Sequence, residues 1–216
     1  MDCCHYNSCS TGRLFSRFAH RYVKRYQRRG LDPNQRQIVD GLQRHGGITG
    51  RSLLEIGCGV GYLHHTLLQQ GAASAVGIDL SEQMLALARQ QAEINHLAER
   101  CRYQLGEFTA LAPELERADI VLLDRVICCY PDARAVLQAA AGKTGALLAL
   151  SYPRDHLFNR LGITLLGMVM RLLRIEFRNY LHRPGDVEAW LQQQALTRCE
   201  QSSTFIWLTE IYSRKP

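Results

Sequence analysis

The sequence predicts a single α/β domain in which helices cover both faces of a mostly parallel sheet. Three observations support this fold class. A strand, a glycine-rich turn, a helix and a second strand that ends in an acid follow one another over residues 52–79. Short apolar runs then alternate with helical patterns along the rest of the chain. A chain of 216 residues that is 46% hydrophobic is long enough to bury one sizeable core.

The first strand and its turn indicate a nucleotide-cofactor site. Residues 52–56 form a short apolar run, which is typical of a buried parallel strand. Gly57, Gly59 and Gly61 follow at alternate positions. Glycine tolerates positive φ and leaves room for a ligand to approach the backbone.

A helix and a second strand complete this unit. The helix is predicted to begin near Tyr62 and to end at Gly71. Residues 75–79 form a second strand that ends in Asp79, and Ser81 is placed to cap a helix over residues 82–95. In a doubly wound sheet, an acid at this strand end binds the ribose hydroxyls of the ligand.

The glycine spacing points to one class of cofactor. Dinucleotide-binding turns read GxGxxG, whereas this chain reads ExGxGxG from Glu55. The pattern resembles motif I of the class I S-adenosylmethionine-dependent methyltransferases, with Asp79 matching their ribose-binding acid. A dinucleotide site, or a glycine turn without a ligand, is the alternative. The resemblance implies an enzyme with a seven-stranded Rossmann-like sheet, an antiparallel edge hairpin and S-adenosyl-L-methionine as cofactor. It implies cofactor-binding roles for Glu55, Gly57, Cys58, Gly59, Gly61, Asp79, Leu80, Met84, Glu107, Phe108 and Asp124.

The residues after the third strand support the same resemblance. Residues 101–105 form that strand and lead directly to Gly106, Glu107 and Phe108. In this family an acid or amide at the corresponding place contacts the amino group of adenine, and Glu107 is similar to it. An ordinary surface turn is the alternative interpretation.

The fourth strand is expected to end at the transferred methyl group. Residues 118–124 are the most apolar strand and are therefore expected at the centre of the sheet. Ligands of open α/β sheets lie beyond the carboxyl ends of the strands, so residues 125–130 should face the methyl acceptor. Cys128, Cys129 and Tyr130, with His182 from a later segment, are the candidate catalytic residues. The segment lacks the (N/D)PP(Y/F) tetrapeptide of enzymes that methylate base amino groups, which favours a small-molecule acceptor.

An apolar insertion interrupts the last part of the sheet. Residues 154–183 follow a helix over 135–141 and a fifth strand over 145–151. The insertion is too short and too interrupted by Arg171 and Arg174 to span a membrane, which takes about 20 apolar residues. We predict that it caps the substrate, with contact to a membrane surface through residues 157–175 as the alternative. A helix over 184–194 and alternating strands over 197–202 and 204–213 close the domain.

The N-terminal region is predicted to form a lid. Residues 13–29 place aromatic and aliphatic side chains on one helical stripe and contain seven Lys or Arg and no acid. The whole chain has a net charge of +6, so the seven positive charges of this segment leave the rest of the chain about neutral. The basic character therefore belongs to this helix. We predict that this helix forms a lid that covers the cofactor pocket. Binding of an anionic membrane or of nucleic acid through residues 13–29 is the alternative, and nucleic acid is the less favoured partner.

Four soft ligands precede this helix. Cys3, Cys4, His5 and Cys9, called here the N-terminal ligand group, could bind zinc, but adjacent cysteines do not fit the spacing of standard structural zinc sites. A packed or frayed terminus is favoured, and we assign no metal. The sequence shows no secretory signal, which predicts a cytoplasmic protein whose eight cysteines are reduced.

The predicted organisation is therefore a lid over residues 1–32 and a cofactor-binding domain over residues 33–216. The order of its later elements is similar to that of magnesium-protoporphyrin methyltransferases, which esterify a tetrapyrrole propionate. We expect methyl transfer from S-adenosylmethionine to a small-molecule nucleophile, with a thiol as one candidate. A tetrapyrrole-like or other carboxylate or hydroxyl is the alternative acceptor, RNA is less favoured, and a non-catalytic binding module is least favoured. If a base is needed, His156, His182 or Tyr130 could provide it.

Overall fold

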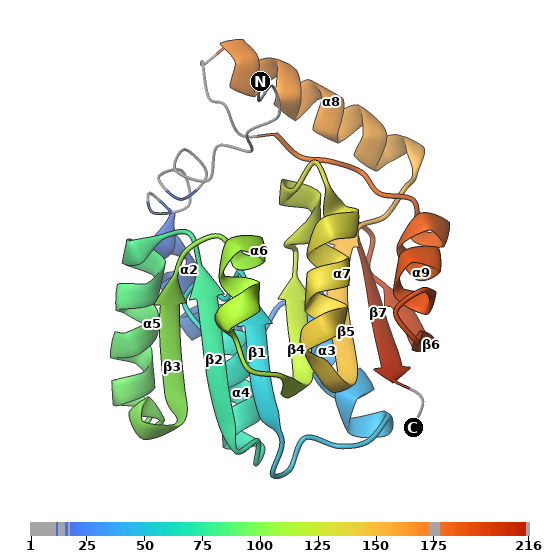
Figure 1. The fold of residues 1–216 in the computed structure, drawn as a ribbon. Coiled ribbons are helices and arrows are strands. Elements are labelled where there is room, and N and C mark those ends of the chain that lie inside the picture. The colour runs from blue at the N-terminus through green and yellow to red at the C-terminus, as the bar shows by residue number, and fades with distance from the viewer. Residues whose placement is uncertain (1–11, 13–15, 17, 173–177, 215–216) are drawn as a thin grey trace.

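The sheet has the predicted architecture. The computed structural model describes residues 12, 16, 18–172 and 178–214, and Figure 1 shows its fold. The described strands are β1 (Ser52–Ile56), β2 (Ser74–Asp79), β3 (Cys101–Leu105), β4 (Ala118–Asp124), β5 (Thr144–Pro153), β6 (Leu196–Ser203) and β7 (Trp207–Arg214). They form one seven-stranded sheet in the order β3-β2-β1-β4-β5-β7-β6. β7 pairs antiparallel with β5 and β6, whereas the other pairs are parallel. The predicted mostly parallel sheet with an antiparallel edge hairpin is confirmed, and β4 is its central strand.

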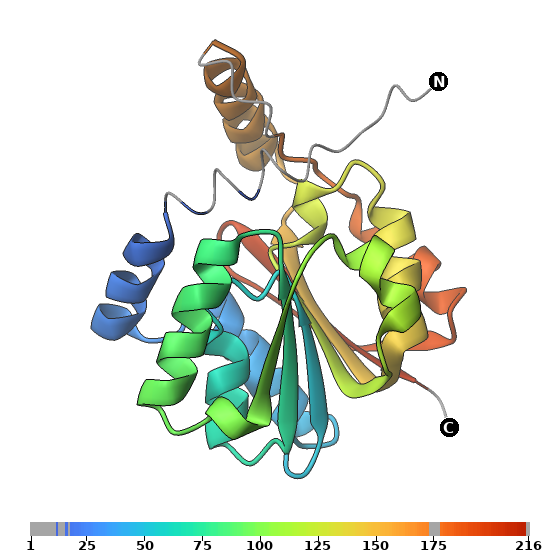
Figure 2. The same cartoon turned by 60° about the vertical axis from the view of Figure 1, so that its left-hand side comes forward.

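Helices cover both faces of this sheet. The described helices are α2 (Ala19–Arg29), α3 (Pro33–Arg44), α4 (Tyr62–Gln69), α5 (Glu82–Ile94), α6 (Phe108–Leu111), α7 (Ala133–Lys143), α8 (Leu157–Leu172) and α9 (Pro184–Gln192), with short 3₁₀ turns at 98–100, 112–114 and 127–129. One apolar core joins the sheet to α6, α7 and α9, and a second joins its other face to α3, α4 and α5. Figure 2 shows the two helical layers on either side of the strands.

Local capping explains where two of these helices begin. The Ser81 hydroxyl accepts a hydrogen bond from the backbone N–H of Met84 at 3.2 Å, as the sequence predicted. At the start of α3, the backbone N–H of Asp32 donates to the side chain of Gln35 at 3.0 Å. α5 begins soon after β2 ends at Asp79, and Asn34 in the first turn of α3 contacts Asp124 at the end of β4, so both helices place their first residues near the edge where the parallel strands end.

The described part of the insertion contains an exposed helix, α8. α8 lies above the carboxyl ends of the parallel strands and stands away from the body of the molecule (Figures 1 and 2). Its apolar side chains are largely exposed, with Leu157 at 82% and Leu172 at 84% of their full accessibility. Asn159 is the only described residue of α8 that is buried. Within the described part of the chain, no helix combines the length and the hydropathy that crossing a membrane requires.

Candidate functional site

A cavity lies at the carboxyl ends of β1, β2 and β4. Its volume is ≈ 350 Å³. Most of the predicted site residues line it, namely Glu55, Gly57, Cys58, Gly59, Asp79, Leu80, Met84, Phe108, Asp124, Cys128, Cys129 and Tyr130. Residues of α2, which was predicted to form a lid, complete the wall together with residues that the sequence did not single out. The latter include Asp32 before α3, Gln35 in the first turn of α3, Asn179 in the insertion and Trp207 of β7.

The three glycines of the turn have different roles. All three have positive φ, at 65° for Gly57, 54° for Gly59 and 83° for Gly61. A Cβ added to Gly57 would lie 2.7 Å from the Val126 side chain, and one added to Gly61 would lie 2.9 Å from the ring of His65. A Cβ on Gly59 would meet nothing within 4 Å. Gly57 and Gly61 therefore permit close packing inside the protein, whereas Gly59 leaves free space on the cavity side.

Asp79 holds the glycine turn against the end of β2. Its carboxylate accepts the backbone N–H of Gly59 at 2.8 Å and the backbone N–H of Ser81 at 2.9 Å. Burial raises the pKa of this carboxyl, while the backbone donors lower it. Each carboxylate oxygen can accept more than one hydrogen bond, so capacity remains for a ligand hydroxyl.

Glu55 faces the cavity from the end of β1 and is 3% exposed. Its Oε2 accepts the backbone N–H of His64 at 3.3 Å and lies 2.5 Å from Nδ1 of the same residue. Burial, followed by the negative charge of Asp124, raises the pKa of Glu55. Glu55 thus connects the cavity to His64 in the first turn of α4.

Asp124 ends β4 and is held by a dense set of donors. Its Oδ1 accepts from the Asn34 side chain at 2.6 Å and from the Ser151 hydroxyl at 2.5 Å. Its Oδ2 accepts from the Gln35 side chain at 2.8 Å and from Arg125 at 3.1 Å. The first turn of α3 therefore fixes the orientation of an acid that lies about 90 residues further along the chain.

Arg125 begins the segment 125–130 that was expected to face the methyl acceptor, but the sequence assigned this residue no role of its own. It has a φ of 60°, which is strained for a residue with a side chain. Its guanidinium donates to Asp32 at 3.0 Å and to Asp124, and it lies 5.6 Å from the centre of the Trp207 ring. Burial lowers the pKa of Arg125, but the carboxylates of Asp124 and Asp32 outweigh it and raise the pKa overall. Its position directly after a strand end was the signal available in the sequence.

The two adjacent thiols lie in the wall behind Arg125. Cys128 and Cys129 both donate to the backbone carbonyl of Arg125, with sulfur to oxygen distances of 3.5 Å and 3.8 Å. A hydrogen bond with Cys129, together with burial, raises the pKa of the Cys128 thiol. Cys128 is therefore protonated at neutral pH. The five cysteines in the described part of the chain are free thiols.

Three predicted site residues lie outside the cavity wall. Gly61 begins α4 and faces the histidines of that helix. Glu107 caps α6, because its Oε2 accepts the backbone N–H of Ala110 at 2.9 Å. Nε2 of His182 lies 2.9 Å from the carbonyl of Ile127, and burial lowers the pKa of this histidine. Adenine contact by Glu107 and catalysis by His182 stay predictions.

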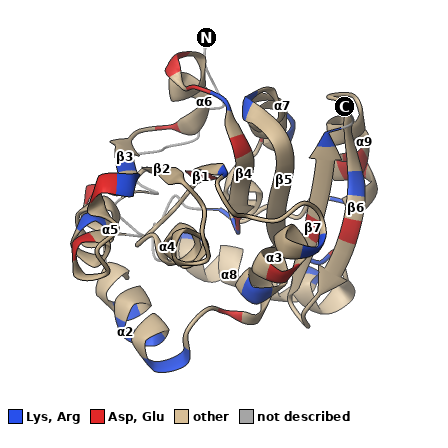
Figure 3. Cartoon of the chain, turned by 90° about the horizontal axis from the view of Figure 1, so that it is seen from below, with Lys and Arg blue, Asp and Glu red and all other residues tan. Residues whose placement is uncertain are grey.

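Aromatic side chains of α2 cover one side of the cavity. Tyr22 and Tyr26 line it together with Tyr62 of α4. The rings of Tyr26 and Tyr62 are stacked, with centroids 3.6 Å apart and planes 7° apart. The outer face of α2 is basic, and Figure 3 shows its Lys and Arg residues with no acid among them. The N-terminal ligand group and most of residues 13–17 lie outside the described residues.

The cavity has the hydrogen-bond acceptors and the apolar surface that a cationic nucleoside cofactor needs. Four carboxylates (Asp32, Glu55, Asp79 and Asp124) and two arginines (Arg25 and Arg125) belong to its described wall. Burial raises the pKa of Glu55 and Asp79, and a positively charged ligand beside them would favour their ionised form. Asp79 offers acceptors for hydroxyl groups, and Gly59 leaves space beside them. Met84, Phe108 and Leu80 supply apolar surface for a base. These residues fit S-adenosylmethionine.

Comparison with known proteins agrees with this site. Residues 53–143 match the methyltransferase domain family. A ubiquinone biosynthesis O-methyltransferase of Pseudomonas aeruginosa is 29% identical over 167 residues, which cover 73% of this chain and 69% of that protein. An enzyme of the same name from Neisseria meningitidis is 32% identical over 112 residues, covering 51% of this chain and 45% of the relative.

Solved structures share the fold over the whole chain. A magnesium protoporphyrin IX methyltransferase from Synechocystis, crystallised with S-adenosylmethionine, superimposes with a TM-score of 0.71 at 20% identity and covers 100% of both chains. The same enzyme with S-adenosylhomocysteine gives a TM-score of 0.70 at 23% identity, covering 94% of this chain and 98% of the other. At this level of identity the likeness concerns the fold.

Proposed function

We propose that this chain, a class I S-adenosylmethionine-dependent methyltransferase, methylates an oxygen atom of a planar small molecule. The class and its cofactor follow from the methyltransferase domain match, the curated relatives and the shared fold. The nature of the acceptor is the proposed part. The curated relatives named above are O-methyltransferases, which agrees with an oxygen acceptor.

The composition of the cavity rim is the observation that supports this proposal best. Tyr22, Tyr130 and Trp207 present aromatic surface there, and Arg125 lies against Trp207. Among the described residues that line the cavity there is no histidine. A carboxylate acceptor is already ionised at neutral pH and needs no general base, so this rim favours a planar acid over an amine or an aliphatic alcohol. A planar phenol is the nearest alternative, since its oxygen ionises more readily than that of an alcohol.

The size of the cavity limits how much of the acceptor it can hold. A volume of ≈ 350 Å³ is near the lower end of ligand pockets, which span about 300–1,000 Å³. The cofactor therefore fills most of the space. We infer that the reacting edge of the acceptor enters between Tyr130 and Arg125, while its flat body rests on the rim.

The mechanism rests on positioning. S-adenosylmethionine supplies an electrophilic methyl group when bound. Asp79 and Gly59 fix one end of the cofactor site, and Asp124 fixes the position of Arg125 at the other. Arg125 attracts and orients an anionic oxygen, and the aromatic wall excludes water from the reacting atoms. Alignment of this kind is worth up to roughly 7–11 kcal/mol in well-oriented reactions.

Two segments are proposed to control access to the site. α2 would act as a lid, because Tyr22 and Tyr26 form part of the wall. The insertion over residues 154–183 would cap the acceptor through its returning segment, residues 178–183, rather than through α8. Asn179 lines the cavity, and the backbone N–H of Tyr180 donates to the carbonyl of Cys128 at 2.7 Å.

The acceptor can be identified by transfer of labelled methyl groups from S-adenosylmethionine. The panel contains porphyrin acids, planar aromatic acids, phenols, small thiols and RNA, with the variant Trp207→Ala tested beside wild type. We expect label on a planar acid or phenol, and a higher KM for that acceptor in the variant, with unchanged affinity for S-adenosylhomocysteine. Label on thiols alone would contradict the oxygen acceptor and support the thiol acceptor that the sequence suggested. Label on RNA alone would contradict both.

We also propose that α8 and α2 bring the enzyme to an anionic membrane surface. α8 exposes Leu161, Leu165 and Met168, and α2 is basic along its outer face. The double variant Leu161→Ser/Leu165→Ser should sediment less with anionic vesicles than wild type does, whereas Ile94→Ser, which alters an exposed apolar residue on α5, should not differ from wild type. Equal sedimentation of the double variant and wild type would refute membrane contact through α8.

A further inference from the structure

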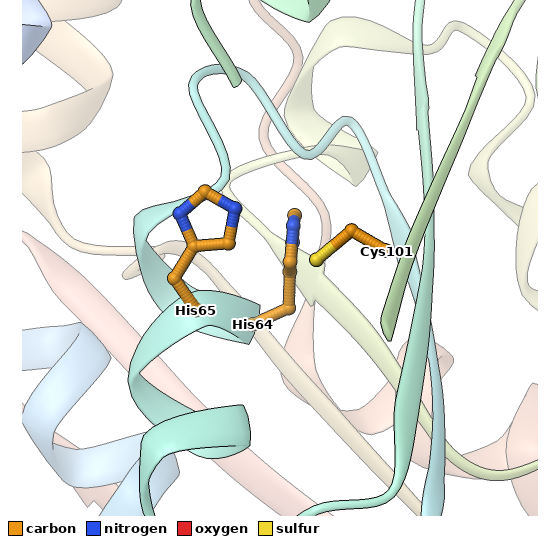
Figure 4. A group of neighbouring side chains, drawn as sticks. All are labelled: His64, His65 and Cys101. Atoms are coloured by element: carbon orange, nitrogen blue, oxygen red, sulfur yellow. The ribbon is translucent and has the colours of Figure 1, made fainter. Parts of the chain in front are cut away.

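A cluster of metal-binding side chains lies behind the glycine turn and takes no part in the proposed reaction. Figure 4 shows His64 and His65 of α4 beside Cys101 of β3, with the His64 ring edge-on between the other two side chains. One ligand atom from each residue lies within 4.8 Å of the others. His64 is 0% exposed, His65 is 2% exposed and Cys101 is partly buried. We call these three residues the histidine–cysteine cluster.

The hydrogen bonds in this cluster leave acceptor sites unmatched. Nδ1 of His64 is used by Glu55, so its Nε2 faces the cluster. The Tyr103 hydroxyl lies 3.0 Å from Nε2 of His64 and 2.6 Å from Nε2 of His65, but it has only one proton to donate. Nδ1 of His65 is buried and has no hydrogen-bond partner among the described residues. A buried polar atom without a partner lowers the stability of the fold. A bound ion would accept lone pairs of the imidazole rings and so reduce the number of unmatched hydrogen-bond acceptors.

The charge state of the two rings suits a metal. Burial lowers the pKa of His64 to about 3 and that of His65 to about 3, so both imidazoles are neutral at physiological pH. Neutral imidazole is the form that coordinates metals. Oε2 of Glu55 also lies 2.5 Å from Nδ1 of His64, in the place that carboxylates take behind the histidine ligands of zinc.

We infer that His64, His65 and Cys101 form a binding site for a divalent transition-metal ion, with zinc as the ion that this ligand set fits. Two imidazole nitrogens and one thiolate are typical zinc ligands, and zinc accepts a fourth ligand to complete a tetrahedron. A water molecule can supply that ligand, with the adjacent Tyr103 hydroxyl, which keeps its proton, as its hydrogen-bond partner. On binding, the Cys101 thiol releases its proton to solvent and the thiolate bonds to the ion. Such an ion would tie α4 to β3 directly behind the glycine turn.

Cobalt(II) titration tests this site, because a cobalt–thiolate bond gives a charge-transfer absorption in the near ultraviolet. The full-length chain is used with the N-terminal ligand group removed by substitution (Cys3→Ser, Cys4→Ser, His5→Gln and Cys9→Ser), so that these residues cannot bind the probe. We expect one cobalt per chain, a charge-transfer band, and displacement of cobalt by zinc.

Single variants in this background locate the site. Cys101→Ser should abolish the band, and His65→Gln should weaken cobalt binding more than ~10-fold, the lower end of what even outer-shell substitutions cost. Cys199→Ser, which removes a partly buried thiol of β6, should behave as the background protein does. Circular dichroism and thermal unfolding verify that each variant is folded. A folded background protein that binds no cobalt, or a band that survives Cys101→Ser, would overturn the inference.

Discussion

Replacement of Gly59 by alanine separates cofactor binding from folding. Gly59 has a φ of 54°, and a Cβ built on it meets nothing within 4 Å. Left-handed backbone costs a residue with a side chain about 1–2 kcal/mol, so we expect Gly59→Ala to lower the free energy of unfolding by that amount. The new methyl group would extend into the space that the cofactor occupies. Overpacking of one methyl group costs about 1–3 kcal/mol, which corresponds to about 5- to 150-fold weaker binding.

Gly50 provides a matched control. It has a φ of 74° in the loop before β1, and its added Cβ also meets nothing within 4 Å. Gly50 is not part of the cavity wall. Gly50→Ala should therefore lose similar stability in urea unfolding and keep its affinity for S-adenosylhomocysteine, measured by calorimetry. If Gly59→Ala binds S-adenosylhomocysteine within twofold of Gly50→Ala, the assignment of the cofactor to the glycine turn is refuted.

Three further substitutions test other parts of the site. Burial lowers the pKa of His65 from 6.5 to about 3. Wild type should therefore lose stability relative to His65→Gln as the pH falls through this range, by up to about 1.4 kcal/mol per pH unit in urea unfolding with a chelator present. If the free energies of unfolding of the two proteins changed in parallel with pH, a neutral buried ring would be contradicted. Arg125→Lys should lower the free energy of unfolding by about 1–3 kcal/mol, because lysine cannot donate to Asp32 and Asp124 together, and an unchanged urea midpoint would argue against this double contact. Tyr26→Ala removes a stacked ring worth about 0.5–1.5 kcal/mol and should weaken S-adenosylhomocysteine binding. Phe18→Ala changes a residue outside the cavity wall and should not weaken this binding. Equal affinities of the two variants for S-adenosylhomocysteine would argue against the lid.

Local patterns in the sequence were sufficient to place the strands and the glycine turn. Residues 118–124 were predicted as a central strand, and β4 spans Ala118–Asp124 at the centre of the sheet. The apolar run and the acid at its end lie within a few residues of each other, so no tertiary information was needed. Ser81 was identified as a cap for the same reason, because a capping side chain acts on its own helix.

Contacts between distant segments could not be predicted in this way. The sequence assigned no site role to Asp32, whereas the structure places its carboxylate 3.0 Å from the Arg125 guanidinium as part of the cavity wall. The sequence identified residues 154–183 as an apolar insertion, but an apolar pattern does not say what covers the side chains, and α8 within this insertion is exposed. The sequence alone provided no reason to separate His64 and His65 from the other residues of their helix. Their distance to Cys101 depends on how α4 packs against β3, which the sequence does not show.

Glu55 connects the cofactor cavity to the histidine–cysteine cluster, and this connection constrains both proposals. Its carboxyl group is part of the cavity wall, accepts the backbone N–H of His64 and lies 2.5 Å from Nδ1 of the same residue. A cation beside His64 would make the ionised form of Glu55 more favourable, and a cationic cofactor in the cavity would act on the same carboxylate. Any such coupling must be reciprocal, because the free energy of binding both ligands does not depend on their order. If zinc changes the affinity for S-adenosylmethionine by some factor, S-adenosylmethionine must change the affinity for zinc by the same factor, which paired titrations measure directly. A factor of one in both titrations would show that the ion, although bound, stabilises α4 and β3 without affecting the methyl donor.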